Sequence, residues 1–382
     1  MSVLLTGATG FVGMEVLARY LDRTYDPVFV AVRARDNAEV DRRIRATLEC
    51  LFGNDDAYRD RVFGVRADIE QPGLGMSDDH REALAEHITG IVHCAATVSF
   101  SLPLEESRRV NVEGTRRMLE LAELCERRGG LEYFSYISTA YVAGAHSGSF
   151  AEDQLEIGQR FRNPYEQSKF EAERLVRACA HRLPILIFRP SVVVGEQSTG
   201  WTASFNVLYT PLKAFEQGTL PAMPARRSAP VDVVPVDYVA DAIFELSAAP
   251  ADPCPTYNLV AGPKATTVGR LIELSADRLH RREPVVIPPG LFRRAVYPVL
   301  RRRGGRLRRG LDRSKVFFPY FAMDITYENE QTRRRLESVG IAVPPIDSYF
   351  DKLLDYAMAA EWGRSSLTRA QAAERRPALS TA

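Results

Sequence analysis

The stretch Gly7-Ala8-Thr9-Gly10-Phe11-Val12-Gly13 decides the fold. It lies between an apolar segment expected as a strand (residues 2–5) and an expected helix (residues 11–21). In this setting Gly7 permits a tight turn, Gly10 lets the backbone approach a pyrophosphate, and Gly13 allows close packing of helix on strand. The amino end of the helix adds a dipole that favours anions. The stretch therefore predicts a dinucleotide-binding fold.

Short β-rich runs alternate with amphipathic helical stretches along the first two-thirds of the chain. This alternation predicts a parallel, doubly wound sheet, a Rossmann-like α/β fold. The further strands are expected at residues 28–32, 62–66, 90–93, 133–138 and 185–189, and the further helices at 39–51, 103–127 and 165–180.

The pattern changes after Pro190, where loops lengthen and proline becomes frequent. We expect a Rossmann domain over residues 1–200, to which residues 228–261 return. Residues 201–227 and 262–364 are expected to form a smaller, mainly α-helical substrate-binding cap. The polar, alanine-rich residues 365–382 carry no pattern and are expected to be a disordered tail.

Composition excludes several classes of protein. The 382 residues are 45% hydrophobic and 26% charged, with a net charge of +1, so nothing global indicates a nucleic-acid partner. The five cysteines are scattered and form no CxxC pair, which argues against a disulfide framework or a metal site and favours a cytoplasmic protein. No run of eighteen or so apolar residues indicates a transmembrane segment.

Two arginines lie where the second strand ends. Enzymes that prefer NAD carry an acidic residue at this position, whereas this chain has Arg33, with Arg35 close by. A guanidinium suits the 2′-phosphate of NADP(H), which we therefore expect as the cofactor. Asp68 and Ile69 follow the third strand, where an acidic side chain can bond the adenine amino group.

Tyr165 and Lys169 are four residues apart on one expected helix and so share a face. An ammonium near a phenol favours the phenolate and lowers the pKa of the tyrosine. Tyr165 can then exchange a proton with a carbonyl oxygen. A second hydroxyl must hold that oxygen. Thr139, just past the fifth strand, is the candidate, with Ser138 beside it.

At this point the sequence resembles the extended short-chain dehydrogenase/reductases, in the branch of fatty acyl-CoA reductases and carrier-protein thioester reductases. The segments that carry the resemblance are residues 6–13, 32–34, 93–96, 98–100, 111–115, 137–142, 163–169, 189–191 and 232–240, and more loosely 319–362. The resemblance implies catalysis by Thr139, Tyr165 and Lys169. With these motifs, the residues expected to line the dinucleotide are Gly7, Thr9, Gly10, Phe11, Val12, Gly13, Arg33, Arg35, Asp68, Ile69, Ala95, Ala96, Asn111, Ser138, Tyr165, Lys169, Pro190, Ser191 and Val192.

The resemblance further implies NADPH-dependent reduction of an acyl thioester to an aldehyde, with the alcohol as a second product left open. Acyl-CoA and acyl carrier protein are the expected substrates. Ten basic residues and one acidic residue in Arg293–Lys315 are interpreted either as a solvated surface or as a docking site for such an anionic partner. A monomer and a homodimer, and a peripheral membrane contact, stay open.

Two alternatives remain. The same residues could serve another carbonyl or alcohol, such as a nucleotide-sugar, a sterol-like alcohol or a free aldehyde, because a fold does not fix a substrate. A non-catalytic NADP(H)-binding protein is the other, although the Tyr165/Lys169 pair argues against it. An acyl substrate needs an apolar tunnel, for which the candidates are Leu208, Leu212, Phe215, Leu291, Phe292, Val296, Phe317 and Phe318. Glu152, Asp153 and Glu156 are expected to be a solvated acidic face.

Overall fold

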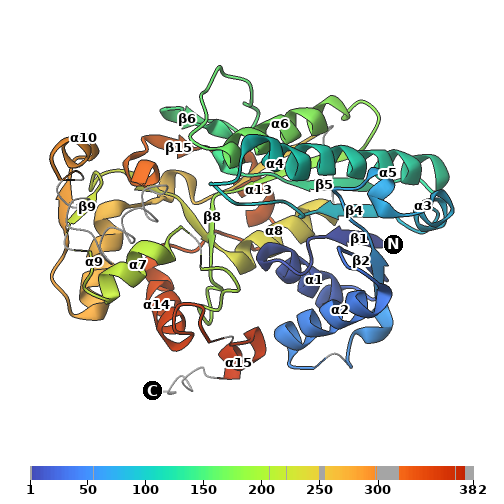
Figure 1. The fold of residues 1–382 in the computed structure, drawn as a ribbon, viewed down its shortest axis with the longest axis horizontal. Helices are drawn as coiled ribbons and strands as arrows, with labels where there is room; N and C mark the ends of the chain where they lie inside the picture. The colour runs from blue at the N-terminus through green and yellow to red at the C-terminus, as the bar shows by residue number, and fades with distance from the viewer. Residues whose placement is uncertain are drawn as a thin grey trace.

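A computed structural model describes residues 2–54, 56–205, 207–220, 222–248, 254–296, 298, 318–365 and 367–374. Its centre is a seven-stranded parallel sheet with the order β12-β7-β5-β4-β1-β2-β3 (Figure 1). The strands are β1 (Val3–Thr6), β2 (Val28–Val32), β3 (Val62–Arg66), β4 (Gly90–His93), β5 (Tyr133–Ile137), β7 (Ile185–Pro190) and β12 (Thr256–Leu259). The expected doubly wound α/β fold is confirmed.

Helices cover both faces of this sheet (Figure 1). The helices α1 (Phe11–Arg23), α2 (Asn37–Phe52) and α8 (Val236–Ala248) pack on one face, where their apolar sides form one core cluster with the strands. The helices α3 (Asp78–Ala85), α5 (Gly114–Arg128) and α6 (Pro164–Ala178) pack on the other. The strand order reverses between β1 and β4, and in such sheets ligands bind in the crevice at that point.

The segment expected as one helix over 103–127 is interrupted. It consists of α4 (Leu104–Arg108), a π-helical turn at Arg109–Glu113, and α5. Such turns insert one residue into a helix and often lie at functional sites. Asn111, within the turn, is 1% exposed and therefore points into the protein.

The cap lies beside the carboxyl ends of the strands, at the left in Figure 1. It contains α7 (Tyr209–Glu216), α9 (Val268–Leu279), α10 (Pro289–Leu291) and α14 (Phe350–Ala359). Two short strand pairs join it to the rest: β10 (Pro230–Val231) with β13 (Thr266–Thr267), and β6 (Gly148–Phe150) with β15 (Ile325–Tyr327). A further pair, β9 (Ala222–Pro224) with β14 (Val285–Ile287), lies within the cap, and β8 (Val192–Val194) pairs with β11 (Val233–Pro235) at its edge.

Glu152 is not part of a solvated acidic face, as the sequence led us to expect. It is 8% exposed and accepts hydrogen bonds from the backbone N–H groups of Gln331 (2.8 Å) and Thr332 (3.1 Å). These residues lie in the first turn of α13 (Glu330–Glu337), whose N–H groups have no partner within the helix. The carboxylate of Glu152 thus caps α13 and holds it against the sheet, whereas Asp153 and Glu156 are exposed.

The expected disordered tail is wrong for the part that the structure describes. The helix α15 (Arg369–Glu374) packs on α2. Its Arg369 lies 3.0 Å from Glu15 of α1 and 3.1 Å from Glu196. The carbonyl of Leu367 accepts hydrogen bonds from Trp201 Nε1 (3.1 Å) and the Tyr356 hydroxyl (3.0 Å). Ion pairs and these two hydrogen bonds therefore attach residues 367–374 to the rest of the molecule, although their sequence has little apolar pattern.

Candidate active site

The glycine stretch forms the tight turn that the sequence predicts. Gly7 has a φ of +72°, and a Cβ there would lie 2.8 Å from the backbone nitrogen of Ala95. A Cβ on Gly13 would lie 2.2 Å from the carbonyl oxygen of Gly7. Both positions therefore need glycine, because backbone atoms cannot give way as a flexible side chain can. The turn leaves the amino end of α1 open toward the crevice.

A cavity of about 290 Å³ follows this turn along the switch point of the sheet. Eight of the expected cofactor residues line it: Gly7, Thr9, Gly10, Arg33, Asp68, Ile69, Ala95 and Ala96. The bare backbone at the glycines, the open helix end and the flanking arginines suit the pyrophosphate and ribose of a dinucleotide. The residues present thus fit the expected cofactor.

The arginines at the end of β2 do not act as the pair that the sequence predicts. Arg33 lines the cavity and donates to Glu70 (2.8 Å), whereas Arg35 donates to Glu39 (2.9 Å) and is outside the lining. The second guanidinium in the cavity belongs instead to Arg43 of α2, which donates to the hydroxyl of Thr9 (3.0 Å). Sequence reasoning missed Arg43 because it lies ten residues farther on, one turn and a half into a helix.

The start of α6 fixes the position of Tyr165. Asn163 caps the helix by accepting a hydrogen bond from Glu166 N (3.0 Å), and Pro164 occupies the first helical position. Both residues are typical of helix starts. Tyr165 consequently lies in the first turn, close to the carboxyl ends of β5 and β7, and Lys169 follows one turn later.

Thr139 and Tyr165 are brought together as expected. The Thr139 hydroxyl donates to the carbonyl of Pro190 (3.4 Å) and accepts from Tyr141 N (3.3 Å). Burial raises the pKa of Tyr165 to about 12, and a side-chain hydrogen bond with Thr139 opposes this rise. Two hydroxyls therefore lie side by side where a carbonyl oxygen could be held.

Lys169 does not lower the pKa of Tyr165 in this arrangement, contrary to expectation. Its ammonium donates to the carbonyl of Ile137 (2.7 Å) and lies 4.3 Å from the ring centre of Tyr136. Burial lowers the pKa of Lys169 itself to about 7, against an opposing effect of Glu173. The expected effect on Tyr165 fails here because the phenol is buried and the ammonium points to the strand.

Two further residues expected at the cofactor, Asn111 and Ser138, are instead hydrogen-bonded within the protein. Asn111 exchanges hydrogen bonds with the backbone of Thr97 (2.8 and 3.1 Å) and donates to Ser168 (2.9 Å), so it fixes the loop after β4 to α6. Ser138 donates to the buried carboxylate of Glu173 (2.6 Å), which leaves its hydroxyl occupied. The residues outside the lining of the dinucleotide cavity are Phe11, Val12, Gly13, Arg35, Asn111, Ser138, Tyr165, Lys169, Pro190, Ser191 and Val192.

Cys94 lines the dinucleotide cavity, but its chemistry is that of a packing residue. Burial raises the pKa of its thiol to about 12. Since the thiolate is the nucleophilic form, this cysteine is not activated. The neighbouring His93 is 1% exposed, hydrogen-bonded to Thr6 (2.8 Å) and Thr115 (3.2 Å), and kept neutral by a pKa that burial lowers to about 3.

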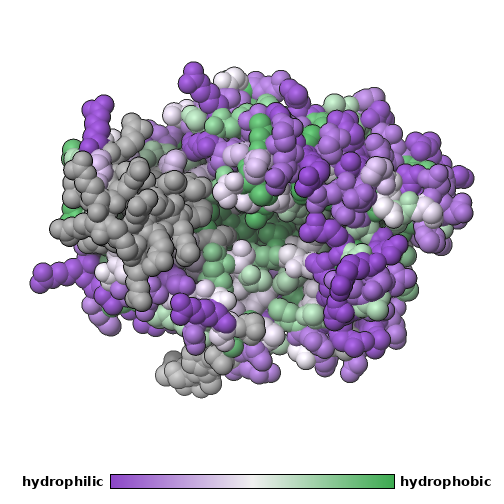
Figure 2. All heavy atoms as spheres, viewed as in Figure 1, coloured by the Kyte–Doolittle hydropathy of each residue, from purple (hydrophilic) through white to green (hydrophobic). Residues whose placement is uncertain are grey.

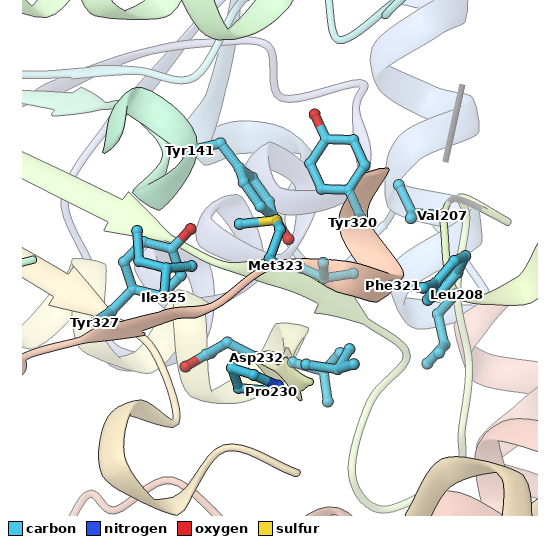
Figure 3. A pocket seen from close by; sticks show the side chains of 13 residues that line it. Tyr141, Val207, Leu208, Pro230, Asp232, Tyr320, Phe321, Met323, Ile325 and Tyr327 are labelled. Atoms are coloured by element: carbon cyan, nitrogen blue, oxygen red, sulfur yellow. The ribbon is translucent and has the colours of Figure 1, made fainter. Parts of the chain in front are cut away.

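A second pocket lies where β8, β10 and β11 meet the cap, and its lining is mainly apolar and aromatic, with Asp232 as a charged member (Figure 3). Its lining includes Tyr141 and Val192, which lie two residues beyond Thr139 and Pro190 respectively, and Leu208 and Phe321 lie next to each other at one end. On the face shown in Figure 2, apolar atoms gather in a hollow at the middle of the molecule. The expected tunnel residue Leu291 is instead 56% exposed, Phe292 is buried elsewhere, and the side chains of Val296, Phe317 and Phe318 lie outside the described residues.

Tyr320 of the cap is hydrogen-bonded to the start of α6. Its hydroxyl donates to the buried carboxylate of Glu166 (2.6 Å) and accepts from Asn163 (2.6 Å). The ring of Phe100 lies between Tyr320 and Tyr165, at centroid distances of 5.4 and 5.5 Å. The first turn of α6 thus positions both Tyr165 and one wall of the apolar pocket.

Comparison with known proteins agrees with this geometry. The family model described as "Male sterility protein" matches residues 5–243. The chain belongs to this family. The resemblance to extended short-chain dehydrogenase/reductases of the acyl-CoA and thioester reductase branch is thereby confirmed.

Among curated relatives, a linear gramicidin synthase of Brevibacillus parabrevis is 28% identical over 93% of this chain, and fatty acyl-CoA reductase 1 of Xenopus laevis is 31% identical over 63%. The chain covers 7% and 53% of these two proteins. Among solved structures, the terminal R domain of the myxalamid pathway has a TM-score of 0.81 and 28% identity, with 96% of this chain and 92% of that chain covered.

No helix in the described part of the chain combines the length and apolarity required to cross a bilayer. The basic segment Arg293–Lys315 lies almost entirely outside the described residues. Its expected role in docking therefore stays a prediction.

Proposed function

We propose that this oxidoreductase uses NADPH to reduce an acyl thioester, carried by coenzyme A or a carrier protein, to an aldehyde. The observation that supports this best is the mainly apolar pocket next to the segments that follow Thr139 and Pro190, in which Asp232 is the one charged residue among the described lining residues. Tyr141 and Val192 belong to its wall. A nucleotide-sugar would need cationic partners for its diphosphate, and no lysine or arginine is among the described residues that line this pocket.

The chain's own residues have separable tasks in this reaction. When bound, reduced nicotinamide supplies the hydride. The hydroxyls of Thr139 and Tyr165 hold the thioester oxygen by hydrogen bonds that strengthen as negative charge develops on it. Tyr165 supplies a proton to that oxygen, which completes a hemithioacetal. When the C–S bond of the hemithioacetal breaks, its oxygen gives up the proton, the leaving thiolate takes up a proton, and the aldehyde forms. Lys169 would hold the nicotinamide ribose, for which its ammonium must turn from the carbonyl of Ile137.

NADP(H) is proposed over NAD(H) on the basis of charge. Arg33 and Arg43 both line the cavity at the end of β2. Guanidinium groups suit a phosphate by bidentate hydrogen bonds. Glu70, which lines the same cavity, is neutralised by Arg33 (2.8 Å) and Arg109 (2.9 Å).

The test is oxidation of NADPH with dodecanoyl-CoA and with a dodecanoyl carrier protein, followed at 340 nm in parallel with direct titration of NADPH. Tyr165→Phe should lower kcat by about a hundredfold or more, since proton transfer by a positioned side chain contributes at least that much. Its affinity for NADPH should stay close to that of the wild type. A protein that binds NADPH and reduces neither thioester would contradict the proposal.

A further inference from the structure

Tyr320 joins a segment of the cap to the helix that carries Tyr165. The segment is the short helical turn Phe318–Ala322. The guanidinium of Arg226 holds this turn to the cap by donating to two successive carbonyls at its end (3.0 and 3.1 Å). On the opposite side, the Tyr320 hydroxyl reaches α6 and donates to the carboxylate of Glu166 (2.6 Å). A single side chain thus connects a fixed part of the cap to the first turn of α6.

Glu166 is a buried carboxylate that depends on few partners. Its side chain is 0% exposed, and besides Tyr320 it accepts from the backbone N–H of Arg162 (2.8 Å) and from the guanidinium of the same residue (3.4 Å). Burial raises the pKa of Glu166, and the hydrogen bond from Tyr320 is the largest effect that opposes this rise. A cap that moved away from α6 would therefore leave a buried charge short of a donor, which favours the docked arrangement.

The ring of Tyr320 packs against neighbours of both hydroxyls that are proposed to hold the substrate oxygen. Phe100 lies between Tyr320 and Tyr165, at centroid distances of 5.4 and 5.5 Å. Tyr141 contacts Tyr320 edge to face at 5.1 Å, as Figure 3 shows from close by. The backbone N–H of Tyr141 in turn donates to the Thr139 hydroxyl (3.3 Å). A shift of Tyr320 would therefore be transmitted to Tyr165 and to Thr139.

From this geometry we infer that Tyr320 and Glu166 are positioning residues, whose hydrogen bond docks the cap against α6. The docked cap keeps the hydroxyls of Thr139 and Tyr165 in the arrangement in which both can bond the thioester oxygen. The inference rests on the proposed thioester reduction, because it is for this oxygen that the two hydroxyls are aligned. A displacement of about 1 Å in a reacting group can cost about a hundredfold in rate. Loss of the bond should therefore slow the reaction more than it weakens binding.

The experiment compares two substitutions that each remove one hydroxyl from a buried tyrosine of the cap. Tyr320→Phe removes the bond to Glu166 and keeps the ring. Tyr349→Phe is the matched control, because Tyr349 is 1% exposed and its hydroxyl has no hydrogen-bond partner among the described residues. With dodecanoyl-CoA we expect Tyr320→Phe to lower kcat at least fivefold and to change KM less than threefold. Its affinity for NADPH should stay within twofold of the wild type, and Tyr349→Phe should keep all three values.

A merely structural role would lower the melting temperature of Tyr320→Phe without lowering kcat in the folded protein. A folded Tyr320→Phe whose kcat falls less than fivefold would therefore overturn the inference while leaving thioester reduction standing. Asn163→Ser serves if Tyr320→Phe does not fold. Asn163 donates to the Tyr320 hydroxyl (2.6 Å) and caps α6. Serine also caps helices but is too short to reach Tyr320, so kcat should again fall, by at least threefold, and a smaller fall would overturn the inference.

Hydrogen–deuterium exchange tests the docked arrangement without turnover. If no thioester is reduced, exchange of the amides of residues 320–327 is compared in the same variants. Exchange at least fivefold faster in Tyr320→Phe than in Tyr349→Phe would support docking by this bond although the proposed function had failed. Equal exchange in the two variants would overturn the docking role too.

Discussion

Lys169 is a lysine almost without contact to water. It is 3% exposed, and burial lowers its pKa to about 7. An amine carries its positive charge below its pKa, so the charged fraction of Lys169 falls as pH rises through 7. We predict that kcat/KM for NADPH falls over the same interval, because this parameter reports the free enzyme and the ammonium is proposed to bind the ribose.

The measurement is initial NADPH oxidation from pH 5.5 to 9.5 at low NADPH and saturating thioester. Lys169→Arg keeps a positive charge over this whole range. Its profile should lose the descending limb near pH 7, even though the absolute rate is lower. A wild-type profile that is flat to pH 9 would contradict the assignment.

Arg43 and Arg33 should discriminate between the two dinucleotides. A hydrogen bond to a charged group contributes about 1.5–3 kcal/mol, which corresponds to a ten- to hundredfold effect. We expect Arg43→Ala and Arg33→Ala each to raise KM for NADPH by about that factor and to leave KM for NADH within twofold. Arg35→Ala is the matched control, because Arg35 pairs with Glu39 outside the cavity. Equal changes with both dinucleotides would refute a phosphate-binding role.

Among single residues, the sequence predicts the positions of those that are set by the local backbone. Gly7, Gly10 and the Thr139–Tyr165 pair lie as expected, because a turn or a helix cap places them. The sequence does not predict which partner a polar side chain contacts. Arg35 and Ser138 turn toward Glu39 and Glu173, which spacing alone does not show, and Arg43 reaches the cavity from a different element.

Glu152 connects two elements that lie far apart in the chain. Its carboxylate accepts from Gln331 N, Thr332 N and the Thr332 hydroxyl, at the first turn of α13. Glu152→Ala would leave the buried N–H and hydroxyl of Thr332, and the partly buried N–H of Gln331, without an acceptor. We predict a loss of about 2–3 kcal/mol in the free energy of unfolding, measured by urea denaturation, because each orphaned buried group costs about 1–3 kcal/mol.

The neighbouring exposed residue Asp153 provides the comparison. Asp153→Ala should change stability by less than about 0.5 kcal/mol, as is usual for surface positions. If both variants lose the same free energy, the carboxylate of Glu152 is not the cap that it is proposed to be.

The observed bounds agree with those predicted from the sequence where the local pattern is strong. The strands at Val28–Val32, Val62–Arg66 and Gly90–His93 have the expected bounds, since short apolar runs between turns specify them. The π-helical turn at Arg109–Glu113 was not expected. An inserted residue shifts the apolar pattern of one flanking helix relative to the other, but α4 (Leu104–Arg108) has only five residues, so the pattern before the turn is too short to reveal the shift.

At the scale of the whole molecule, the C-terminal segment contacts both the Rossmann part and the loop that leads to the cap. Arg369 contacts Glu15, whose carboxylate is fully buried in α1, and Glu196 in the loop that leads to the cap. Arg369→Ala should lower the free energy of unfolding by about 2–3 kcal/mol. This is below the range for a fully buried pair because Arg369 is 22% exposed and Arg19 still contacts Glu15.

Arg364→Ala is the control, because this arginine is exposed and precedes the segment. Thermal denaturation of both variants checks the prediction, and equal melting temperatures would contradict it. The sequence did not predict this connection because Arg369 and Glu15 are separated by almost the entire chain. The cap was predicted only in outline, since its short strand pairs depend on the same kind of distant contact.

The helix α1 that opens toward the dinucleotide also holds Arg369 through Glu15. If packing of the C-terminal segment on α1 favours the geometry of α1 that binds the dinucleotide, then segment packing and dinucleotide binding share one coupling free energy. Reciprocity then requires that the dinucleotide protect the segment around Leu367 from proteolysis by the same factor with which the segment tightens the dinucleotide. The end of the chain would then report, by its rate of cleavage, on the occupancy of a site built at its beginning.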